Sequence, residues 1–358
     1  MGEYAVHKNI ASQIVDGAKI AIVMDYPTVN EVRLNKILAG DYLLGKVCKL
    51  AGIQLEECML THVFQRRPAQ ENLQNFFHKR SEYKALCKGT EWRTPYPSST
   101  LGFLKQETQP HLERLYREIN EVKPNVIIAL GAISLWAFTG YDKIGTYRGA
   151  LISSNTSHIN DEIKIVPSYA LSSVSKNYAL RSIVYSDFKK ALREADTKDI
   201  VNIERELWIE PSINDLDKFK QDFIRRDNAK HPLAFDIETA GGQITCIGFA
   251  PSSTHAIVVP FTYGYWKKDD ETKAWDWVKE LLEDERITKV AQNQSYDVSW
   301  LTYKKNINVK GIVHDTMHAQ HALQPEMEKG LGFLGSIYTN EGAWKTLAKF
   351  SQSTKADE

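Results

Sequence analysis

The chain has 358 residues, and its 45 Lys and Arg balance 45 Asp and Glu, so the formal net charge at pH 7 is zero. Its length favours two domains, and a hydrophobic content of 42% is sufficient for packed cores. No apolar run is long enough to span a bilayer and no signal-peptide pattern opens the chain, so we expect a cytoplasmic protein without a membrane partner.

The charges and cysteines are distributed unevenly. Residues 1–200 carry 26 Lys and Arg against 21 Asp and Glu, whereas the remainder carries 19 against 24. This mild asymmetry fits a basic binding surface in the first half and a carboxylate-rich site in the second. Cys48, Cys58, Cys87 and Cys246 form no Cys-x-x-Cys pair, which favours reduced and mostly buried thiols over a zinc or iron–sulfur site.

Strand and helix patterns alternate through residues 1–195. Short apolar runs predict strands at 19–24, 58–63, 125–130 and 163–166. Helical periodicity predicts helices at 41–50, 106–122, 131–136 and 178–194. This alternation predicts an α/β fold in which helices cover both faces of a parallel sheet.

A basic and aromatic stretch lies between Arg66 and Trp92. Its members include Arg66, Arg67, Phe76, Phe77, Lys79, Arg80 and Trp92. Cations that neutralise phosphates, together with rings that stack on bases, suit single-stranded DNA, so we expect Arg66, Arg67, Lys79 and Arg80 to bind DNA. The alternative is an ordinary insertion whose rings pack on the core and whose charges face water, and this is favoured for the two phenylalanines.

The first half resembles the uracil-DNA glycosylase superfamily. The segments that carry the resemblance are 23–28, 39–53, 61–68, 128–132 and Arg148-Gly149. The resemblance implies a three-layer α/β/α domain. Asp25 retains the acid of the loop, but Leu38 stands where the family has a stacking aromatic, and His62 stands where it has a base-reading asparagine.

The histidine of a Tyr-His-Pro motif is also missing after Tyr169. Because uracil excision needs the base stacked, read and supplied with a proton donor, the departures favour a degenerate, DNA-binding or architectural domain. Active uracil removal is the last of the possibilities. On the alternative interpretation, Asp25 caps its loop and His62 is a structural histidine with satisfied hydrogen bonds.

A polar stretch at 194–202 predicts a linker, and a second α/β region begins near Leu207. Strands are predicted near 233–237, 243–250 and 254–260, followed by a helix at 271–284. Three strands in succession before a helix predict a mixed sheet.

Two carboxylates, Asp236 and Glu238, stand two residues apart at the end of the apolar run that starts at Leu233. On a strand, residues i and i+2 point to the same face, so these side chains project together. Their mutual repulsion is relieved by a divalent cation, which prefers carboxylate oxygens. The segment 290–297 predicts a strand end and a helix start and adds Asp297, which completes a candidate site for metal-assisted hydrolysis.

Simpler roles exist for single acids. An Asp-x-Glu pair at a strand end often occurs by chance. Asp297 alone could be a helix N-terminal charge, and Asp315 is expected to cap the helix that follows it.

The second half resembles the proofreading 3′–5′ exonuclease domain of family A DNA polymerases, within the DEDD superfamily. The matching segments are 235–239, 293–297, 314–321 and 330–334, and the resemblance implies an RNase H-like mixed-sheet fold. It further implies that Asp236 bridges two Mg²⁺ or Mn²⁺ ions, that Glu238 holds one ion and orients the attacking water, and that Asp297 holds the second ion through water. By the same resemblance, Asn293 and Tyr296 place the terminal nucleotide.

The family's last motif, Tyr-x-x-x-Asp, is not found after Lys345, and Asp357 is a poor substitute for its carboxylate. We therefore expect an N-terminal fragment of a phage-type family A DNA polymerase, with a glycosylase-like domain at 1–198 and an incomplete exonuclease domain at 199–358. Its expected partners are single-stranded 3′ ends of DNA and a polymerase domain in cis or in trans, in the cytoplasm of a host cell. The alternative is a non-catalytic DNA- or protein-binding module with a silent exonuclease fold.

Overall fold

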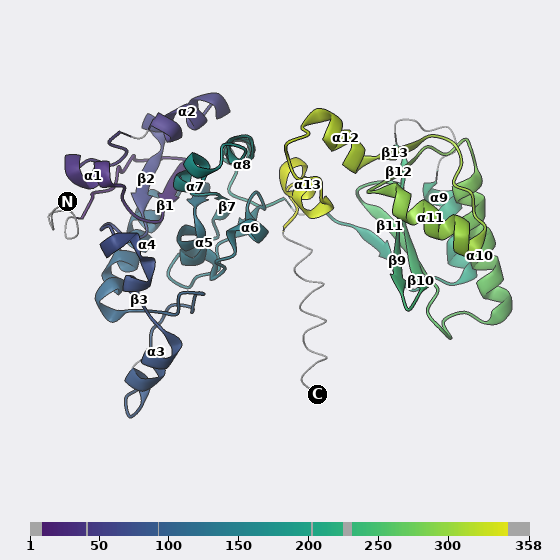
Figure 1. Cartoon of the computed structure of the whole chain (residues 1–358), viewed down its shortest axis with the longest axis horizontal. Coiled ribbons are helices and arrows are strands. Elements are labelled where there is room, and N and C mark those ends of the chain that lie inside the picture. Colours follow the sequence, from purple (N-terminus) through teal and green to yellow (C-terminus); the bar gives the residue numbers. More distant parts are fainter. Residues whose placement is uncertain (1–8, 41, 92, 202, 225–230, 343–358) are drawn as a thin grey trace. The chain divides into compact units, whose positions relative to one another are not determined.

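Two compact units divide the chain (Figure 1). The computed structural model describes residues 9–40, 42–91, 93–201, 203–224 and 231–342. The first unit comprises residues 1–200 together with the segment from Gly332 onward, and the second comprises Val201–Leu331. The predicted division at residue 198 lies two residues from this boundary. The segment from Gly332, however, was placed in the second domain from sequence and clusters with the first unit in the structure.

The first unit is built on a five-stranded sheet with the strand order β2-β1-β5-β7-β6. Its strands are β1 (Ile20–Met24), β2 (Met59–His62), β5 (Val126–Leu130), β6 (Ile152–Ser153) and β7 (Lys164–Ser168). The first four in the order pair in parallel, as predicted, whereas the short edge strand β6 is antiparallel and was not predicted. All five residues of β5 are buried, which is typical of a central parallel strand covered on both faces.

Alternate residues of each strand enter two different hydrophobic cores. Ala21 and Val23 of β1 join a core with helices α4 (Gln109–Val122) and α5 (Ala132–Thr139). Ile20 and Ile22 join the opposite core, which includes helices α2 (Tyr42–Ala51) and α8 (Leu180–Glu194). The period-two alternation of a strand therefore places helices on both faces, which confirms the predicted α/β arrangement.

Shorter elements complete the first unit. The helices are α1 (Val29–Leu34), α3 (Arg80–Cys87), α6 (Ile144–Tyr147), α7 (Leu171–Lys176) and α13 (Leu331–Tyr338), the last of which begins one residue before the unit boundary. A small antiparallel sheet pairs β3 (Phe77–His78) with β4 (Phe103–Leu104). Single 3₁₀ turns lie at Leu55–Glu57, Ala69–Glu71, Leu73–Phe76 and Gln106–Thr108. The predicted helix at 106–122 thus starts as a 3₁₀ turn and becomes α-helical at Gln109.

The second unit is built on a six-stranded mixed sheet with the order β13-β12-β9-β10-β11-β8. Its strands are β8 (Glu206–Trp208), β9 (Leu233–Ala240), β10 (Gln243–Ala250), β11 (His255–Pro260), β12 (Lys289–Ala291) and β13 (Val313–Asp315). Strand β10 is antiparallel to both of its neighbours, and the remaining pairs are parallel, which confirms the predicted mixed sheet.

The helices of the second unit are α9 (Ile213–Phe223), α10 (Lys268–Glu283), α11 (Gln294–Lys305) and α12 (Thr316–Leu323). Apolar side chains of α9 and α10, such as Phe219 and Val278, share one core with Phe235 and Ile247 of the sheet. The helix predicted at 271–284 starts one turn earlier, and helix α9 and the short edge strand β8 were not predicted.

None of the four cysteines, all of which lie in the described residues, forms a disulfide; Cys48 and Cys58 are buried, and the other two are half-buried. In the described part of the chain, no helix is long and apolar enough to cross a membrane.

Candidate active site

Strand β9 presents Asp236 and Glu238 on one exposed face, while Phe235 and Ile237, which alternate with them, are buried. The neighbouring strand β10 places Gly248 opposite Asp236 and Cys246 opposite Glu238. Directly paired residues of adjacent strands share a face. Burial raises the pKa of the Cys246 thiol, and the negative charges of Glu238 and Asp236 raise it further. The two acids therefore lie together on the face that the sequence predicted.

Asp297 lies in the first turn of α11 and is buried, with only 3% of its surface exposed. Its Oδ1 accepts a hydrogen bond of 3.0 Å from the backbone N–H of Ile237, the residue between the two strand acids. Burial raises the pKa of Asp297 to about 6, and the charges of Asp236 and Glu238 act in the same direction. Residues 60 positions apart in the chain are thus brought to one site, and Asp297 is more than a helix-terminal charge.

The turn that leads into α11 depends on Asp315, at the end of β13. Its carboxylate accepts hydrogen bonds from the backbone N–H groups of Asn293 (3.1 Å) and Gln294 (2.9 Å). It also caps α12 by accepting from Met317 (2.8 Å), which confirms the predicted cap. Burial by itself raises the pKa of Asp315, but its backbone N–H donors outweigh burial and hold the pKa below its ordinary value. The second role of Asp315, as the acceptor that fixes the β12–α11 turn, was missed from sequence.

The two residues expected to place a terminal nucleotide are both exposed. Asn293 adopts the left-handed conformation at the start of α11, with φ of 57°. The hydroxyl of Tyr296 lies 2.7 Å from Oγ1 of Thr239, at the end of β9. Thr239 was not singled out from sequence, although it directly follows the acidic pair, and only the fold brings it to Tyr296.

Asp236, Glu238 and Asp297 offer carboxylate oxygens, the ligands that hard divalent cations prefer. These side chains are not arranged as a complete metal-binding site. Across the described residues, no three His, Cys, Asp or Glu side chains are grouped so that they could hold a metal ion. Asp357 and the region after Lys345 lie outside the described residues.

In the first unit, the basic and aromatic stretch divides into inward and outward members. Phe76 and Phe77 are buried in the core, which confirms the packing interpretation. Arg66 lies over the ring of Phe76, 5.5 Å from its centroid, and is half-buried. Arg67 forms an ion pair with Glu71 and donates a 2.9 Å hydrogen bond to the carbonyl of Pro27.

Lys79 and Arg80, at the start of α3, are exposed. Of the four cations predicted to bind DNA, these two are exposed, whereas Arg66 and Arg67 make contacts within the unit. Trp92 lies outside the described residues.

Asp25 and His62 lie at the carboxyl ends of β1 and β2. Oδ1 of Asp25 accepts from both the backbone N–H and the hydroxyl of Ser134, each at 2.8 Å, so it caps α5 and not its own loop. Burial raises the pKa of Asp25 to about 6. Nε2 of His62 lies 3.5 Å from Oε1 of the buried Glu31, which also accepts a 2.7 Å hydrogen bond from the N–H of Leu38.

His62 is buried, as expected for a structural histidine. Its two ring nitrogens have no hydrogen-bond partner among the described residues, so the expectation of satisfied hydrogen bonds is wrong.

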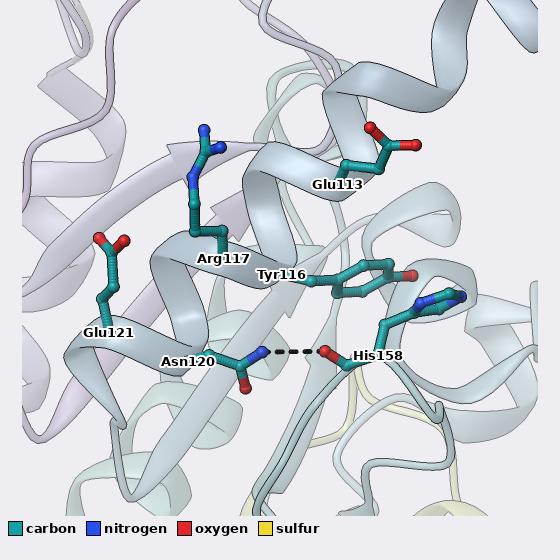
Figure 2. A pocket seen from close by; sticks show the side chains of 6 residues that line it. All are labelled: Glu113, Tyr116, Arg117, Asn120, Glu121 and His158. Atoms are coloured by element: carbon teal, nitrogen blue, oxygen red, sulfur yellow. Dashed lines mark hydrogen bonds between the residues drawn. The ribbon is translucent and has the colours of Figure 1, made fainter.

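A separate pocket of about 420 Å³ lies along α4 of the first unit (Figure 2). It is lined by Glu113, Tyr116, Arg117, Asn120, Glu121 and His158. The rings of Tyr116 and His158 stack at 5.1 Å, and Nδ2 of Asn120 donates to the carbonyl of His158 at 2.9 Å. No motif marked these residues in the sequence, and their contacts hold the loop around His158 on α4.

Residues 212–357 match a family model described as 3′–5′ exonuclease. Among solved structures, the chain is similar to Brucella melitensis NrnC with bound Mg²⁺, at 20% identity over 38% of this chain and 61% of that chain, with a TM-score of 0.26. It is similar to the EXO domain of Aedes aegypti Nibbler, at 14% identity over 40% of this chain and 73% of that one, with a TM-score of 0.31.

A third similar structure is the EXD2 exonuclease domain soaked in Mn and GMP, at 17% identity over 37% of this chain and 68% of that one, with a TM-score of 0.27. The chain spans 61% of the length of the NrnC structure with bound Mg²⁺. The family match covers β9, α11 and β13, the elements that carry the acids described above. The chain therefore carries a domain of the 3′–5′ exonuclease family over residues 212–357.

Proposed function

We propose that the second unit is a metal-dependent 3′–5′ exonuclease that removes nucleotides from single-stranded 3′ ends of DNA. The observation that carries this proposal is the 3.0 Å hydrogen bond from Ile237 to Asp297, because it ties the third carboxylate to the strand segment between Asp236 and Glu238. The match to the exonuclease family over the same residues supports it.

Asp236, Glu238 and Asp297 would hold Mg²⁺ or Mn²⁺. When bound, such ions stabilise the negative charge on the attacking and leaving oxygens of an in-line phosphodiester hydrolysis. Without ions, three neighbouring carboxylates repel one another, and the raised pKa of Asp297 reflects that repulsion in addition to burial.

The chain's own groups would position the substrate. Tyr296 is held against Thr239 at the edge of the acidic face and exposes 46% of its surface, so its ring is accessible for stacking on a terminal base. Asn293, exposed at the start of the same helix, lies three residues from that ring and offers an amide for hydrogen bonding to the nucleotide.

The test is the shortening of 5′-labelled single-stranded DNA by the full chain in Mg²⁺ and in Mn²⁺. We expect stepwise shortening from the 3′ end, abolished by chelation with EDTA. Asp236→Ala should lower the rate about 100-fold or more, because metal-ion stabilisation of a transition state is worth several kcal/mol.

Asp269→Asn is the matched control, since Asp269 is an exposed acid in the first turn of α10. Full activity in Asp236→Ala, or shortening that survives EDTA, contradicts the proposal. Parallel reactions on RNA of the same sequence decide between the two nucleic acids.

A second candidate is a nucleic-acid-binding module with a silent exonuclease fold. It is favoured by the finding that the described residues contain no ready-made metal cage. In that case the chain binds single-stranded DNA in a salt-sensitive manner without shortening it, and Asp236→Ala leaves binding intact.

For the first unit, we propose a glycosylase-like domain in a DNA-binding or architectural role, within a phage-type DNA polymerase. The support is the parallel sheet covered on both faces, the resemblance of its segments, and the exposed cations Lys79 and Arg80. Binding of single-stranded DNA should weaken in the Lys79→Ala, Arg80→Ala double variant. Release of uracil from a uracil-bearing oligonucleotide would overturn the architectural assignment.

A further inference from the structure

A cluster of buried charges in the first unit takes no part in the proposed nuclease site. Arg148, Asp187 and Lys190 are each at most 3% exposed, and they come from the loop before β6 and from helix α8. Nη2 of Arg148 lies 3.5 Å from Oδ1 of Asp187, and Oδ2 of Asp187 accepts a 2.7 Å hydrogen bond from Ser168. Buried charges need such partners, because their removal from water costs several kcal/mol per ion.

Lys190 finds its other partners on helix α13. Its ammonium donates to the carbonyl oxygens of Ser336 (2.5 Å) and Thr339 (2.7 Å), and a third hydrogen bond goes to the carbonyl of Gly149. An ammonium has three donors, so all three are satisfied. The carbonyls of the last helical turn have no partner within the helix and carry its negative dipole end, so a buried cation stabilises them.

Arg148 and Gly149 complete the contact with α13. The guanidinium of Arg148 lies over the ring of Phe333, 4.8 Å from its centroid, and donates a 2.5 Å hydrogen bond to the hydroxyl of Ser336. Gly149 has φ of +68°, and a Cβ there would lie 2.9 Å from the carbonyl oxygen of Ser336, so a glycine permits this close approach. The Arg-Gly pair that stood out in the sequence therefore lies against the Phe333–Ser336 segment of the helix.

We propose that Arg148, Gly149 and Lys190 form a receptor on the first unit for the carboxyl end of helix α13, so that the chain is anchored there both before and after the second unit. The chain leaves the first unit after residue 200 and returns to it at Gly332. The Val201–Leu331 unit is thus an insertion, and the segment that follows it completes the first unit. Nδ2 of Asn340, which donates to Glu194 at 2.6 Å, extends the same anchor.

The charge balance of the receptor depends on all of its members. Burial raises the pKa of Asp187 to about 6, although Arg148 and Ser168 oppose this, and burial lowers the pKa of Lys190 to about 8. Replacement of Lys190 by a side chain without a donor leaves the main-chain carbonyls of Ser336 and Thr339, at the carboxyl end of α13, without this partner in a partly buried place, where an unsatisfied polar group is costly. The receptor therefore fits the carboxyl end of a helix, where main-chain carbonyl oxygens have no partner within the helix.

The proposal is tested by hydrogen–deuterium exchange of the full chain. We expect the amides of α13 to be protected like those of α8 in the unaltered protein. In Lys190→Met, exchange in α13 should accelerate at least about tenfold, while peptides from β9 and β10 remain unchanged. Lys189→Met is the matched control, because Lys189 is the exposed neighbour on the same helix.

A second variant keeps the test decisive if Lys190→Met fails to fold. The Phe333→Ala, Ser336→Ala double variant removes the two side chains of α13 that Arg148 contacts and leaves Arg148, Gly149 and Lys190 unaltered. Faster exchange confined to α13 supports the receptor. Unchanged protection of α13 in this variant, or α13 amides that exchange at the unfolded-chain rate in the unaltered protein, overturns it.

Discussion

Single residues around the acidic face show how backbone pairing controls access to a site. Gly248 lies opposite Asp236 and leaves room on the carboxylate face, because an added Cβ would have only the carbonyl oxygen of Asp236 within 4 Å, at 3.9 Å. A larger side chain is therefore compatible with the backbone but projects next to the acids. The absence of a side chain at this position is a candidate feature for substrate access.

Gly248→Leu is expected to raise the KM for single-stranded DNA at least about tenfold, or about 1.4 kcal/mol, by occupying the substrate's space. Gly248→Ala, which adds only the methyl group, is the matched control and should stay within about threefold of the unaltered protein. Steady-state nuclease kinetics and thermal unfolding are the measurements. An unchanged KM in a folded Gly248→Leu protein contradicts this account of the face.

Burial of the Asp25 carboxyl makes the stability of the first unit depend on pH. The pKa of this carboxyl is raised from 3.8 to about 6, mainly by burial, while the hydrogen bonds from Ser134 lower it. An acid with a raised folded-state pKa stabilises the fold below its unfolded pKa and loses that stabilisation as pH rises through about 6. Asp187 acts in the same direction, whereas His111, whose pKa burial lowers to about 4, acts in the opposite one.

Asp25→Asn keeps the oxygen that accepts from Ser134 but removes the ionisation. We expect it to stabilise the first unit by about 2–3 kcal/mol at pH 7.5 and by about half as much at pH 5, because the unfolded carboxyl ionises from about 3.8 upward whereas the folded one ionises only near 6. The measurement is the urea unfolding midpoint of the variant and of the unaltered protein at both pH values. Because Asp187 and His111 are present in both proteins, their contributions cancel in the difference. Equal effects of the substitution at the two pH values would show that the carboxyl does not titrate in this window.

At the scale of elements, the site depends on two helices that start beside one carboxylate. Asp315 is the N-cap of α12 and also accepts from the first residues of the turn into α11, the helix that carries Asp297 and Tyr296. The cap is a local feature, because the acid directly precedes the helical run. The contact with the other turn arises because β12 and β13 pair in parallel, with Ala291 opposite Asp315.

Asp315→Ala is expected to lower stability by about 1–3 kcal/mol, because several partly buried N–H groups lose their acceptor. At temperatures where the protein remains folded, kcat should fall more than KM changes, since Asp297 is displaced with its helix. Asp315→Asn, which keeps one acceptor oxygen, should restore part of both properties. This prediction rests on the proposed nuclease function.

The control for that prediction is Asp215→Asn. Asp215 accepts from the backbone N–H and hydroxyl of Ser212 at the start of α9, so its loss weakens a helix start on the same unit. We expect lower stability and unchanged kcat. If Asp315→Asn and Asp215→Asn have the same kinetic effect, the positioning role of Asp315 is refuted.

At the scale of the whole molecule, the residues that match the exonuclease family model and the residues of the second compact unit have different boundaries. The match runs from residue 212 to residue 357, but the described residues from Gly332 cluster with the first unit. The sequence pattern 330–334 resembles an exonuclease segment, and nothing in it reveals that Ser336 and Thr339 meet a lysine of helix α8. Residues 146 and 149 positions apart form these contacts, and a local pattern carries no information at that separation.

Features that depend on neighbouring residues could be predicted from the amino-acid sequence alone. The period of two placed Asp236 and Glu238 on one face of β9, the alternation of apolar runs predicted both sheets, and the acid before a helical run predicted the cap at Asp315. Only the tertiary structure decided that Asp297 meets Ile237, that Tyr296 meets Thr239, and that Arg66 and Arg67 make contacts within the unit. The physical reason is that periodicity and capping are fixed within one or two turns of chain, whereas these contacts depend on which distant strands pair and which helices pack against them.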